Sequence, residues 1–227
     1  MKRRKSIRLG PHFWDDVSAA FILGIAVALV GVAAYLLVDM RDPLEVSQSQ
    51  VVKIEVTTTD GGEATASGVI IAEDGLILTN RHVVADAASF RVTLRDGATY
   101  VGERMWVSEE AYDAALVRIR PILPVEAARV SCRRPRVGDE VYAIGHPLGE
   151  DWSVTFGHIS ADRGAYLQTD LNVLPGNSGG GLFNSDGKLI GLPSHLSVYL
   201  MGWSVSLTQQ TYAVSTASIC ALLGRSI

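Results

Sequence analysis

Residues 175–180 read Pro-Gly-Asn-Ser-Gly-Gly, and this hexapeptide is the most informative stretch of the 227-residue chain. A nucleophilic Ser178 hydroxyl must be reached by an incoming carbonyl group, while the backbone N–H groups of Gly176 and Ser178 turn inward as oxyanion donors. Glycine lacks a Cβ atom, so it lets the chain crowd closely around a substrate. Because most glycine-rich turns are only tight connections, the hexapeptide indicates catalysis only if a base and an orienting acid accompany it.

Candidates for both groups precede the hexapeptide. His82 lies within Leu-Thr-Asn-Arg-His-Val-Val at residues 78–84, and Asp113 opens Asp-Ala-Ala-Leu-Val-Arg-Ile at residues 113–119. Each adjoins an apolar stretch, so each can sit at the end of a buried element and face a cleft. Taken singly, either residue is more often structural, and an aspartate here is commonly a helix N-cap or a turn residue. The order His, Asp, Ser is that of chymotrypsin-type enzymes, and it differs from the orders of α/β-hydrolases and subtilisins.

From about Val51 to Leu223 the chain resembles the HtrA/Deg-type trypsin-like serine proteases. The resemblance implies an all-β fold of two six-stranded antiparallel β-barrels with a short C-terminal helix. It also implies a serine endopeptidase with catalytic His82, Asp113 and Ser178, acting on unfolded or exposed proteins, as in protein quality control. Further matching motifs occur at residues 67–71, 137–140, 143–149, 168–170 and 187–191.

Short segments rich in β-branched residues, separated by Asp-Gly turns, favour an all-β barrel or sandwich independently of the resemblance. We expect barrel one at about residues 51–130, barrel two at about 135–214, and a closing helix at about 215–224 with Ser215 as its N-cap. The strands expected in barrel one are Val51–Thr57, Gly68–Ala72, Leu76–Thr79, Phe90–Leu94 and Leu116–Arg120. Those expected in barrel two are Glu140–Gly145, Ser153–Ser160, Tyr166–Thr169, Gly181–Asn184, Lys188–Pro193 and Tyr212–Val214.

The resemblance also assigns supporting and specificity residues. Ser194 matches a serine that hydrogen-bonds the catalytic aspartate in trypsin-like enzymes, so its hydroxyl is expected near Asp113. Asn172 matches the base of the primary specificity pocket, Pro193 its back and Gln210 its wall. An uncharged Asn172 argues against cleavage after Lys or Arg and favours small or aliphatic substrate residues. The polar character of Asn172 and Gln210 leaves a polar preference open.

The N-terminal region predicts a membrane anchor. Residues 17–38 carry no charge and are long enough to cross a hydrocarbon core about 30 Å thick as a helix. The basic tail at residues 1–16 favours a cytoplasmic N-terminus. We therefore expect a single-pass inner-membrane protein with a tether at residues 39–50 and an extracytoplasmic protease domain at 51–227. The small residues 32–34 leave a cleaved signal peptide open as an alternative.

The composition argues against several classes of partner and cofactor. Beyond Val38 the chain holds 15 basic and 22 acidic residues, a net charge of −7, which argues against a nucleic-acid partner. The two cysteines and five histidines show no ligand spacing, so we expect no metal and no cofactor. His146 and His158 are interpreted as structural and His12 as solvated.

Several alternatives stay open at this stage. In trypsin-like folds the terminal helix packs near the linker between the barrels, so Cys132 and Cys220 either form a disulfide or are two separately buried thiols. The chain ends at Ile227 without the PDZ module common in this family, which puts PDZ-driven substrate capture and oligomer gating in doubt. A homo-oligomer is open. The second function class is an inactive or latent binding protein built on a protease fold.

Overall fold

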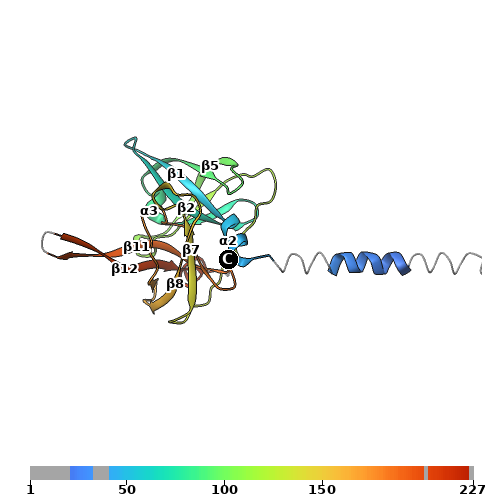
Figure 1. The fold of residues 1–227 in the computed structure, drawn as a ribbon. Coiled ribbons are helices and arrows are strands. Elements are labelled where there is room, and N and C mark those ends of the chain that lie inside the picture. The colour runs from blue at the N-terminus through green and yellow to red at the C-terminus, as the bar shows by residue number, and fades with distance from the viewer. Residues whose placement is uncertain (1–20, 33–40, 202–203, 225–227) are drawn as a thin grey trace, which may run out of the picture. The chain divides into compact units, whose positions relative to one another are not determined.

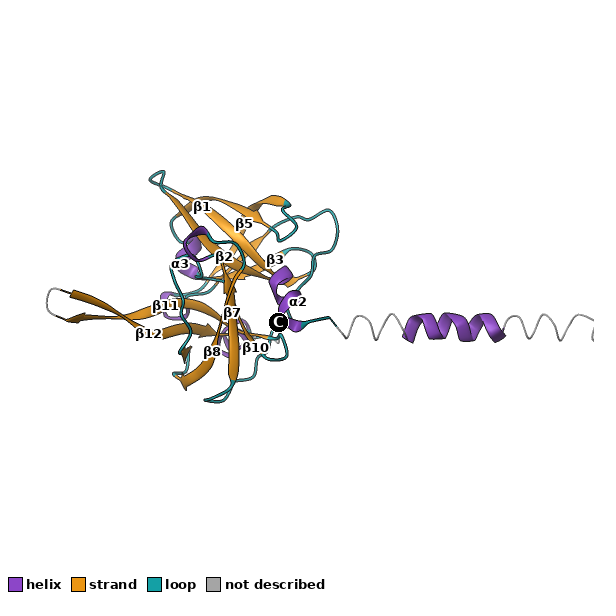
Figure 2. Ribbon diagram, viewed as in Figure 1, coloured by secondary structure: helices purple, strands orange, loops and turns teal. Residues whose placement is uncertain are grey.

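The computed structural model describes residues 21–32, 41–201 and 204–224. A compact unit begins at Pro43 and contains two closed antiparallel β-barrels, which confirms the predicted fold (Figures 1 and 2). Barrel one follows the order β1-β2-β3-β6-β5-β4 and barrel two the order β7-β8-β9-β12-β11-β10. The strands of barrel one are β1 (Val51–Thr58), β2 (Glu63–Ala72), β3 (Leu76–Thr79), β4 (Ala87–Thr93), β5 (Thr99–Val107) and β6 (Ala115–Arg118). Those of barrel two are β7 (Glu140–Gly145), β8 (Ser153–Asp162), β9 (Tyr166–Thr169), β10 (Gly181–Asn184), β11 (Leu189–Met201) and β12 (Ser204–Ser215).

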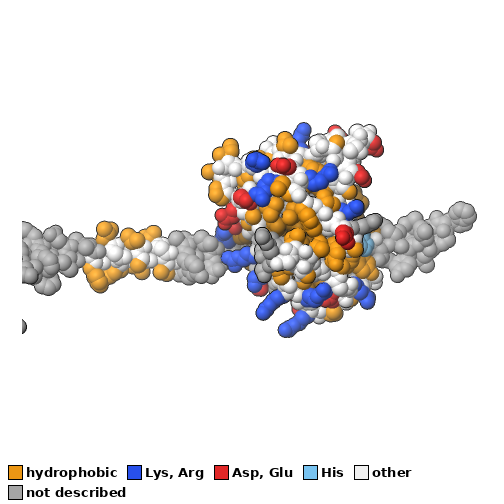
Figure 3. All heavy atoms as spheres, turned by 180° about the vertical axis from the view of Figure 1, so that it is seen from behind, with side chains coloured by type: hydrophobic (Ala, Val, Ile, Leu, Met, Phe, Trp, Pro, Cys, Tyr) orange, Lys and Arg blue, Asp and Glu red, His pale blue; other side chains and the backbone are white. Residues whose placement is uncertain are grey.

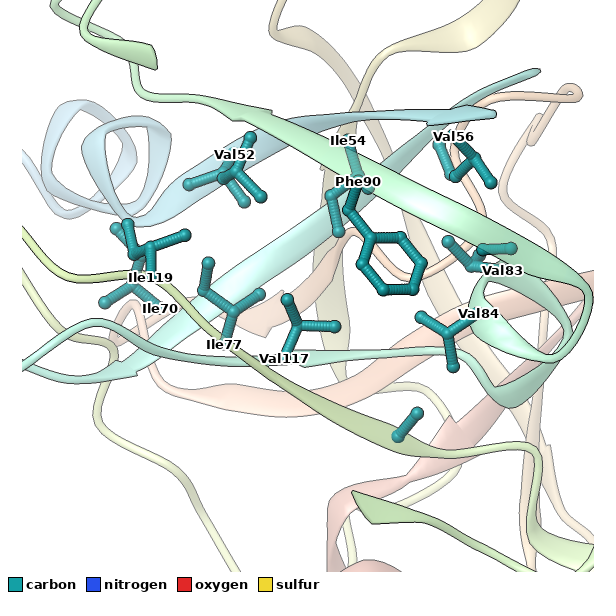
Figure 4. Packing of buried hydrophobic residues seen from close by; sticks show 14 of the residues in the cluster. Val52, Ile54, Val56, Ile70, Ile77, Val83, Val84, Phe90, Val117 and Ile119 are labelled. Carbon is teal, nitrogen blue, oxygen red and sulfur yellow. The ribbon is translucent and has the colours of Figure 1, made fainter. Parts of the chain in front are cut away.

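Alternation along the strands explains how the barrels pack. Successive side chains of a strand point to opposite faces, so one strand can serve two apolar clusters. In β1, Val52 and Ile54 lie in the core of barrel one (Figure 4). Val51 joins a different cluster, which includes Phe183 and Leu192 of barrel two. Strands at this contact are therefore buried on both faces, and the cluster that they share fixes one barrel against the other.

The C-terminal helix α4 (Thr216–Leu223) is tied to the linker between the barrels. Cys220 forms a disulfide with Cys132, which resolves the alternative that the sequence left open. The Thr216 hydroxyl also donates a hydrogen bond to the Ser131 carbonyl at 2.6 Å. The disulfide spans 88 positions of the chain, and a disulfide typically stabilises a fold by about 2–4 kcal/mol.

The segment expected to be a tether differs in the structure, because Pro43–Gln50 forms the helix α2. Its buried side chains are the polar Ser47 and Gln50. The Ser47 hydroxyl lies 2.9 Å from the Tyr142 hydroxyl, and the Gln50 amide donates to the Ala127 carbonyl at 3.3 Å. The helix is therefore held by hydrogen bonds to β7 and to the linker between the barrels, which is why the sequence carries no apolar periodicity there.

The sheets differ from the prediction in the length of two strands and in the position of a third. Strands β11 and β12 run well beyond the expected Lys188–Pro193 and Tyr212–Val214, pairing as far as Met201 with Ser204, and project as a hairpin (Figure 1). Strand β5, the sixth strand of barrel one, was not located from the sequence, because all of its residues are exposed or half-buried and form no apolar run.

The N-terminal prediction is described only in part. Residues 21–32 are helical, whereas residues 17–20 and 33–38 of the expected anchor and the whole basic tail lie outside the described residues. Over the described ranges, the structure contains no helix with the length and apolar character needed to span a membrane.

Candidate active site

His82 and Asp113 face each other at one end of barrel one. The single turn α3 (Arg81–Val84) follows β3, and its buried Val83 and Val84 hold the turn while His82 stays at the surface. The His82 Nδ1 atom lies 3.0 Å from each carboxylate oxygen of Asp113, and the His82 backbone N–H also donates to Oδ1 at 3.0 Å. One carboxylate thus fixes both the backbone and the ring of His82.

Asp113 is itself held from several directions. It follows the short helix η1 (Glu110–Tyr112) with φ 41° and ψ 49°, a left-handed conformation that costs a non-glycine residue free energy. The Asn80 amide donates to the Asp113 carbonyl at 2.9 Å, and the Ser194 hydroxyl donates to Oδ2 at 2.5 Å. Burial raises the pKa of the Asp113 carboxyl, but the hydrogen bonds from His82 and Ser194 outweigh it, so the net pKa is below the ordinary value. The carboxylate is therefore ionised at neutral pH.

Ser178 lies in barrel two, in the loop between β9 and β10. Its Oγ atom donates to the carbonyl of Ser194 at 3.5 Å, so residue 194 contacts Asp113 through its side chain and Ser178 through its backbone. Within the described chain, no hydrogen bond joins the Ser178 hydroxyl to the His82 ring. Such hydrogen bonds are often long in the absence of substrate. The structure therefore brings His82, Asp113, Ser178 and Ser194 into one connected site.

The turn before Ser178 carries two unused backbone donors. The Leu148 N–H donates to the Pro175 carbonyl at 2.8 Å. Because the C=O and N–H of a trans peptide point in opposite directions, the Gly176 N–H points away from Leu148. Among the described residues, none accepts a hydrogen bond from the N–H of Gly176 or Ser178. Gly176 has φ +102°, and a Cβ atom there would lie 2.2 Å from the His146 carbonyl oxygen, so this turn requires glycine.

Ser67, which was not predicted from the sequence to be a site residue, holds the turn at Gly176–Ser178. The Ser67 hydroxyl donates to the Gly176 carbonyl at 2.8 Å, and the Ser67 N–H donates to the Ser178 carbonyl at 2.9 Å. Ser67 Oγ also accepts from the His146 N–H at 3.1 Å and lies 3.0 Å from His146 Nδ1. The only signal for Ser67 was its place at the start of the matching motif at residues 67–71.

His146 lies buried beneath the turn. Its ring lies nearly perpendicular to that of Trp152, at a centroid distance of 4.7 Å. Burial lowers the pKa of His146 to about 4, so the imidazole is neutral over most of the pH range. His146 is therefore structural, as predicted, and it also supports the candidate site, because its backbone and its ring both contact Ser67, which holds the oxyanion turn.

The three residues assigned to the specificity pocket are not gathered around one described cavity. Asn172 lines a cavity of about 250 Å³ together with Val154 and Leu174. Pro193 is buried in β11 and Gln210 is exposed on β12, and neither lines that cavity.

The surface offers no arrangement for a metal ion within the described residues, where no three His, Cys, Asp or Glu side chains form a suitable group. His158 is exposed and pairs with Asp170 at 3.3 Å. Figure 3 shows positive and negative side chains interspersed over one face of the molecule.

Comparison with known proteins agrees with this geometry. The sequence pattern of the trypsin-like peptidase domain matches residues 66–192, more than half of the chain. The chain belongs to this trypsin-like peptidase family. Its relatives include the putative serine protease HhoA of Synechocystis, 42% identical over 141 residues, and the serine endoprotease DegS of Escherichia coli, 40% identical over 141 residues. Each of these alignments covers 56% of this chain but only 35% and 38% of the relative, respectively.

Solved structures place this trypsin-like domain among HtrA-type proteases, which confirms the resemblance. The HtrA-type protease AlgW, solved with a tripeptide, superposes with a TM-score of 0.71 at 28% identity, covering 81% of this chain and 62% of that one. A serine endoprotease from Yersinia pestis gives a TM-score of 0.70 at 30% identity, covering 82% and 65%. The chain thus spans about a third of the length of the curated relatives and under two thirds of these solved chains.

Proposed function

We propose that this chain is a serine endopeptidase that cleaves peptide bonds through Ser178, His82 and Asp113. The observation that carries the proposal is the continuous set of contacts between the two barrels. It joins His82 to Asp113, Asp113 to Ser194, and Ser194 to Ser178. The two unused N–H donors of Gly176 and Ser178 support the same reaction class, because acyl transfer requires donors aimed at a developing oxyanion.

The proposed mechanism assigns one role to each group. Ser178 Oγ attacks the scissile carbonyl while His82 Nε2 takes the hydroxyl proton. Asp113 stays ionised, keeps the proton of His82 on Nδ1, and stabilises the imidazolium. The N–H groups of Gly176 and Ser178 bind the oxyanion of the tetrahedral intermediate. His82 then protonates the leaving amine, and water, activated by the same imidazole, hydrolyses the acyl-enzyme and restores Ser178.

Hydrolysis of labelled casein tests the proposal. Ser178→Ala and His82→Ala should each remove nearly all turnover while leaving the melting temperature nearly unchanged, because nucleophile and base act as a unit. Equal turnover by the wild type and Ser178→Ala would overturn the assignment. A folded wild type that never turns over casein or peptides would favour the second function class, a latent binding protein on a protease fold.

We propose substrates that present small or aliphatic residues before the cut, in unfolded or exposed extracytoplasmic proteins. With Asn172 in place of an acidic residue, an entering Lys or Arg would lose hydration without gaining an ion partner, which costs several kcal/mol. A peptide-library profile should therefore lack basic residues, and Asn172→Asp should shift cleavage toward Lys and Arg. A wild-type profile dominated by basic or aromatic residues would show that the pocket assignment is wrong.

We further propose that residues 17–38 anchor the chain in the inner membrane with its N-terminus in the cytoplasm. The support is the uncharged 22-residue stretch preceded by five basic residues. Protease added to spheroplasts should digest the 51–227 domain and spare an N-terminal epitope. Protection of the domain would contradict this topology, and a soluble form beginning near Tyr35 would indicate a cleaved signal peptide.

A further inference from the structure

His195 is a second imidazole beside the candidate active site, and the mechanism above does not use it. It follows Ser194 on β11. Its ring stacks on Tyr212 at a centroid distance of 5.0 Å and an interplanar angle of 9°. The Tyr166 ring lies nearly perpendicular to it, at a centroid distance of 5.2 Å and an interplanar angle of 71°. Two tyrosines from β9 and β12 thus hold the ring in one orientation, and its Nδ1 atom lies 3.2 Å from Ser194 Oγ.

The protons around Ser194 determine the direction of this contact. A hydroxyl group has one proton to donate and two acceptor positions. Ser194 gives its proton to Oδ2 of the ionised Asp113, because a carboxylate only accepts hydrogen bonds. Ser194 Oγ can then only accept from His195, so Nδ1 carries the proton. The result is a directed chain from His195 Nδ1–H to Ser194 Oγ–H to the Asp113 carboxylate.

The surroundings of His195 keep it neutral. The His195 side chain is exposed, and its partial desolvation against the neighbouring strands lowers its pKa; the negative charge of Asp113 raises the pKa and the positive charge of protonated His82 lowers it. The other titratable groups packed against the ring are Tyr166 and Tyr212. A neutral imidazole has one N–H, and the contact with Ser194 selects the tautomer that carries it on Nδ1.

We propose that His195 is a positioning residue for the Asp113 carboxylate, acting through the Ser194 hydroxyl. This inference rests on the proposed peptidase function. An Nδ1–H bond to Ser194 Oγ restricts the rotation of that hydroxyl and polarises it, which strengthens its hydrogen bond to Asp113. Asp113 in turn orients His82. The residue responsible is supplied by β11 of barrel two, so barrel two orients the acid–base pair of barrel one as well as carrying the nucleophile.

Two substitutions separate the hydrogen bond from the packing. His195→Phe keeps a flat ring between the tyrosines but removes the donor. His195→Asn removes the ring but places an amide nitrogen at the position of Nδ1. We expect His195→Phe to lower kcat about fivefold with KM unchanged, the loss that corresponds to one hydrogen bond of about 1 kcal/mol. His195→Asn should retain most of the kcat even though it loses thermal stability.

A double-substitution cycle with Ser194→Ala tests whether His195 acts through Ser194. In the Ser194→Ala background, His195→Phe should produce no further loss of kcat, because the chain to Asp113 is already broken. His158→Phe is the matched control, since His158 is an exposed histidine that also contacts an aspartate, Asp170, but has no described contact with Ser194 or Asp113. It should leave kcat and KM unchanged.

Three outcomes would overturn the inference. Additive losses in the cycle, a raised KM with unchanged kcat in His195→Phe, or a loss of kcat in His195→Asn as large as in His195→Phe would each exclude positioning through Ser194. All variants are also assayed by the rate of labelling with a fluorophosphonate. A wild type that neither labels nor hydrolyses would overturn the peptidase function and this inference with it, whereas an active wild type with an additive cycle would overturn this inference alone.

Discussion

The two barrels have the same connectivity but contribute to the site in different ways. In each barrel the third strand leads into a connection that carries a proposed catalytic residue, His82 after β3 and Ser178 after β9. Barrel one holds its residue by side-chain hydrogen bonds to one carboxylate, that of Asp113. Barrel two places Ser178 in a turn that requires glycine, and the backbone N–H of Ser67, from β2 of barrel one, donates a hydrogen bond to its carbonyl. Two barrels with the same strand order can therefore position a catalytic residue in different ways, one through a side-chain carboxylate and the other through the backbone of a glycine turn.

Asp113→Asn should have the largest effect, because barrel one depends on a single side chain. The amide cannot hold the proton of His82 on Nδ1, and we expect kcat to fall about 10⁴-fold in steady-state peptide assays. Asp170→Asn is the matched control, since Asp170 also pairs with a histidine, and its kcat should change less than about twofold, as for ordinary surface substitutions. Comparable losses in both variants would remove the special role of Asp113.

Gly176→Ala tests the backbone side of the comparison. A Cβ atom at φ +102° would collide with the His146 carbonyl, so the turn must shift and the oxyanion donor moves. We expect a loss of about 10²–10³-fold in kcat, the effect of losing one oxyanion donor. Gly138→Ala provides the control, because Gly138 has φ +89° with open space around it. A Gly176→Ala enzyme that kept wild-type kcat would show that this turn does not supply the donor.

His146→Asn tests, through the pH dependence of stability, whether the buried histidine beneath the glycine turn of Ser178 is neutral. The folded pKa of about 4 lies below the ordinary value of 6.5, so as the pH falls through this window the unfolded chain binds a proton that the native state does not. Stability is therefore lost between these pH values, by about 3 kcal/mol in total. Urea unfolding at pH 7 and pH 4.5 should show a smaller loss in His146→Asn than in the wild type, by about 2–3 kcal/mol. Equal losses would mean that His146 does not stay neutral in the native state.

Ser67→Ala should give the smallest effect on kcat, because it removes the side-chain contacts to the Gly176 carbonyl and to His146 but leaves the backbone bond to Ser178 in place. We expect kcat to fall about five- to tenfold, the cost of about 1–1.4 kcal/mol in holding the Gly176 carbonyl. Ser47→Ala is the control, since Ser47 is also buried and hydrogen-bonded but contacts Tyr142. Its stability should fall similarly in thermal melts while its kcat stays unchanged. Equal changes of kcat in the two variants would count against the role of Ser67.

The sequence predicted the strands with apolar runs and the residues in dense motifs. Residues 76–79, 140–145 and 181–184 were predicted with the observed bounds, because short β-branched stretches between turns leave little alternative. Strand β5 was missed because none of its residues is fully buried, and helix α2 because its buried residues are polar. Neither element therefore shows a periodic pattern of apolar residues in the sequence. The extension of β11 and β12 was missed because the hairpin projects from the barrel.

The same difference holds for the site. His82, Asp113 and Ser178 were found because each lies in a motif that the family also carries. The contacts of Ser67, His146 and His195 depend on residues distant in the sequence. Ser67 hydrogen-bonds Gly176, 109 positions away, His146 contacts Ser67, 79 positions away, and the His195 ring stacks on Tyr212, 17 positions away. Sequence motifs and periodicity do not reveal which distant residues contact one another.

The central claim is that Ser178 is a nucleophile activated across the two barrels, and covalent labelling measures this most directly. The folded protein is treated with a fluorophosphonate, digested, and mapped by mass spectrometry. We predict a single adduct on Ser178, its absence in Ser178→Ala, and a much slower labelling rate in His82→Ala, since a serine without its base is a weak nucleophile. A folded protein that carries no adduct on Ser178, or that labels at an equal rate without His82, would contradict the account.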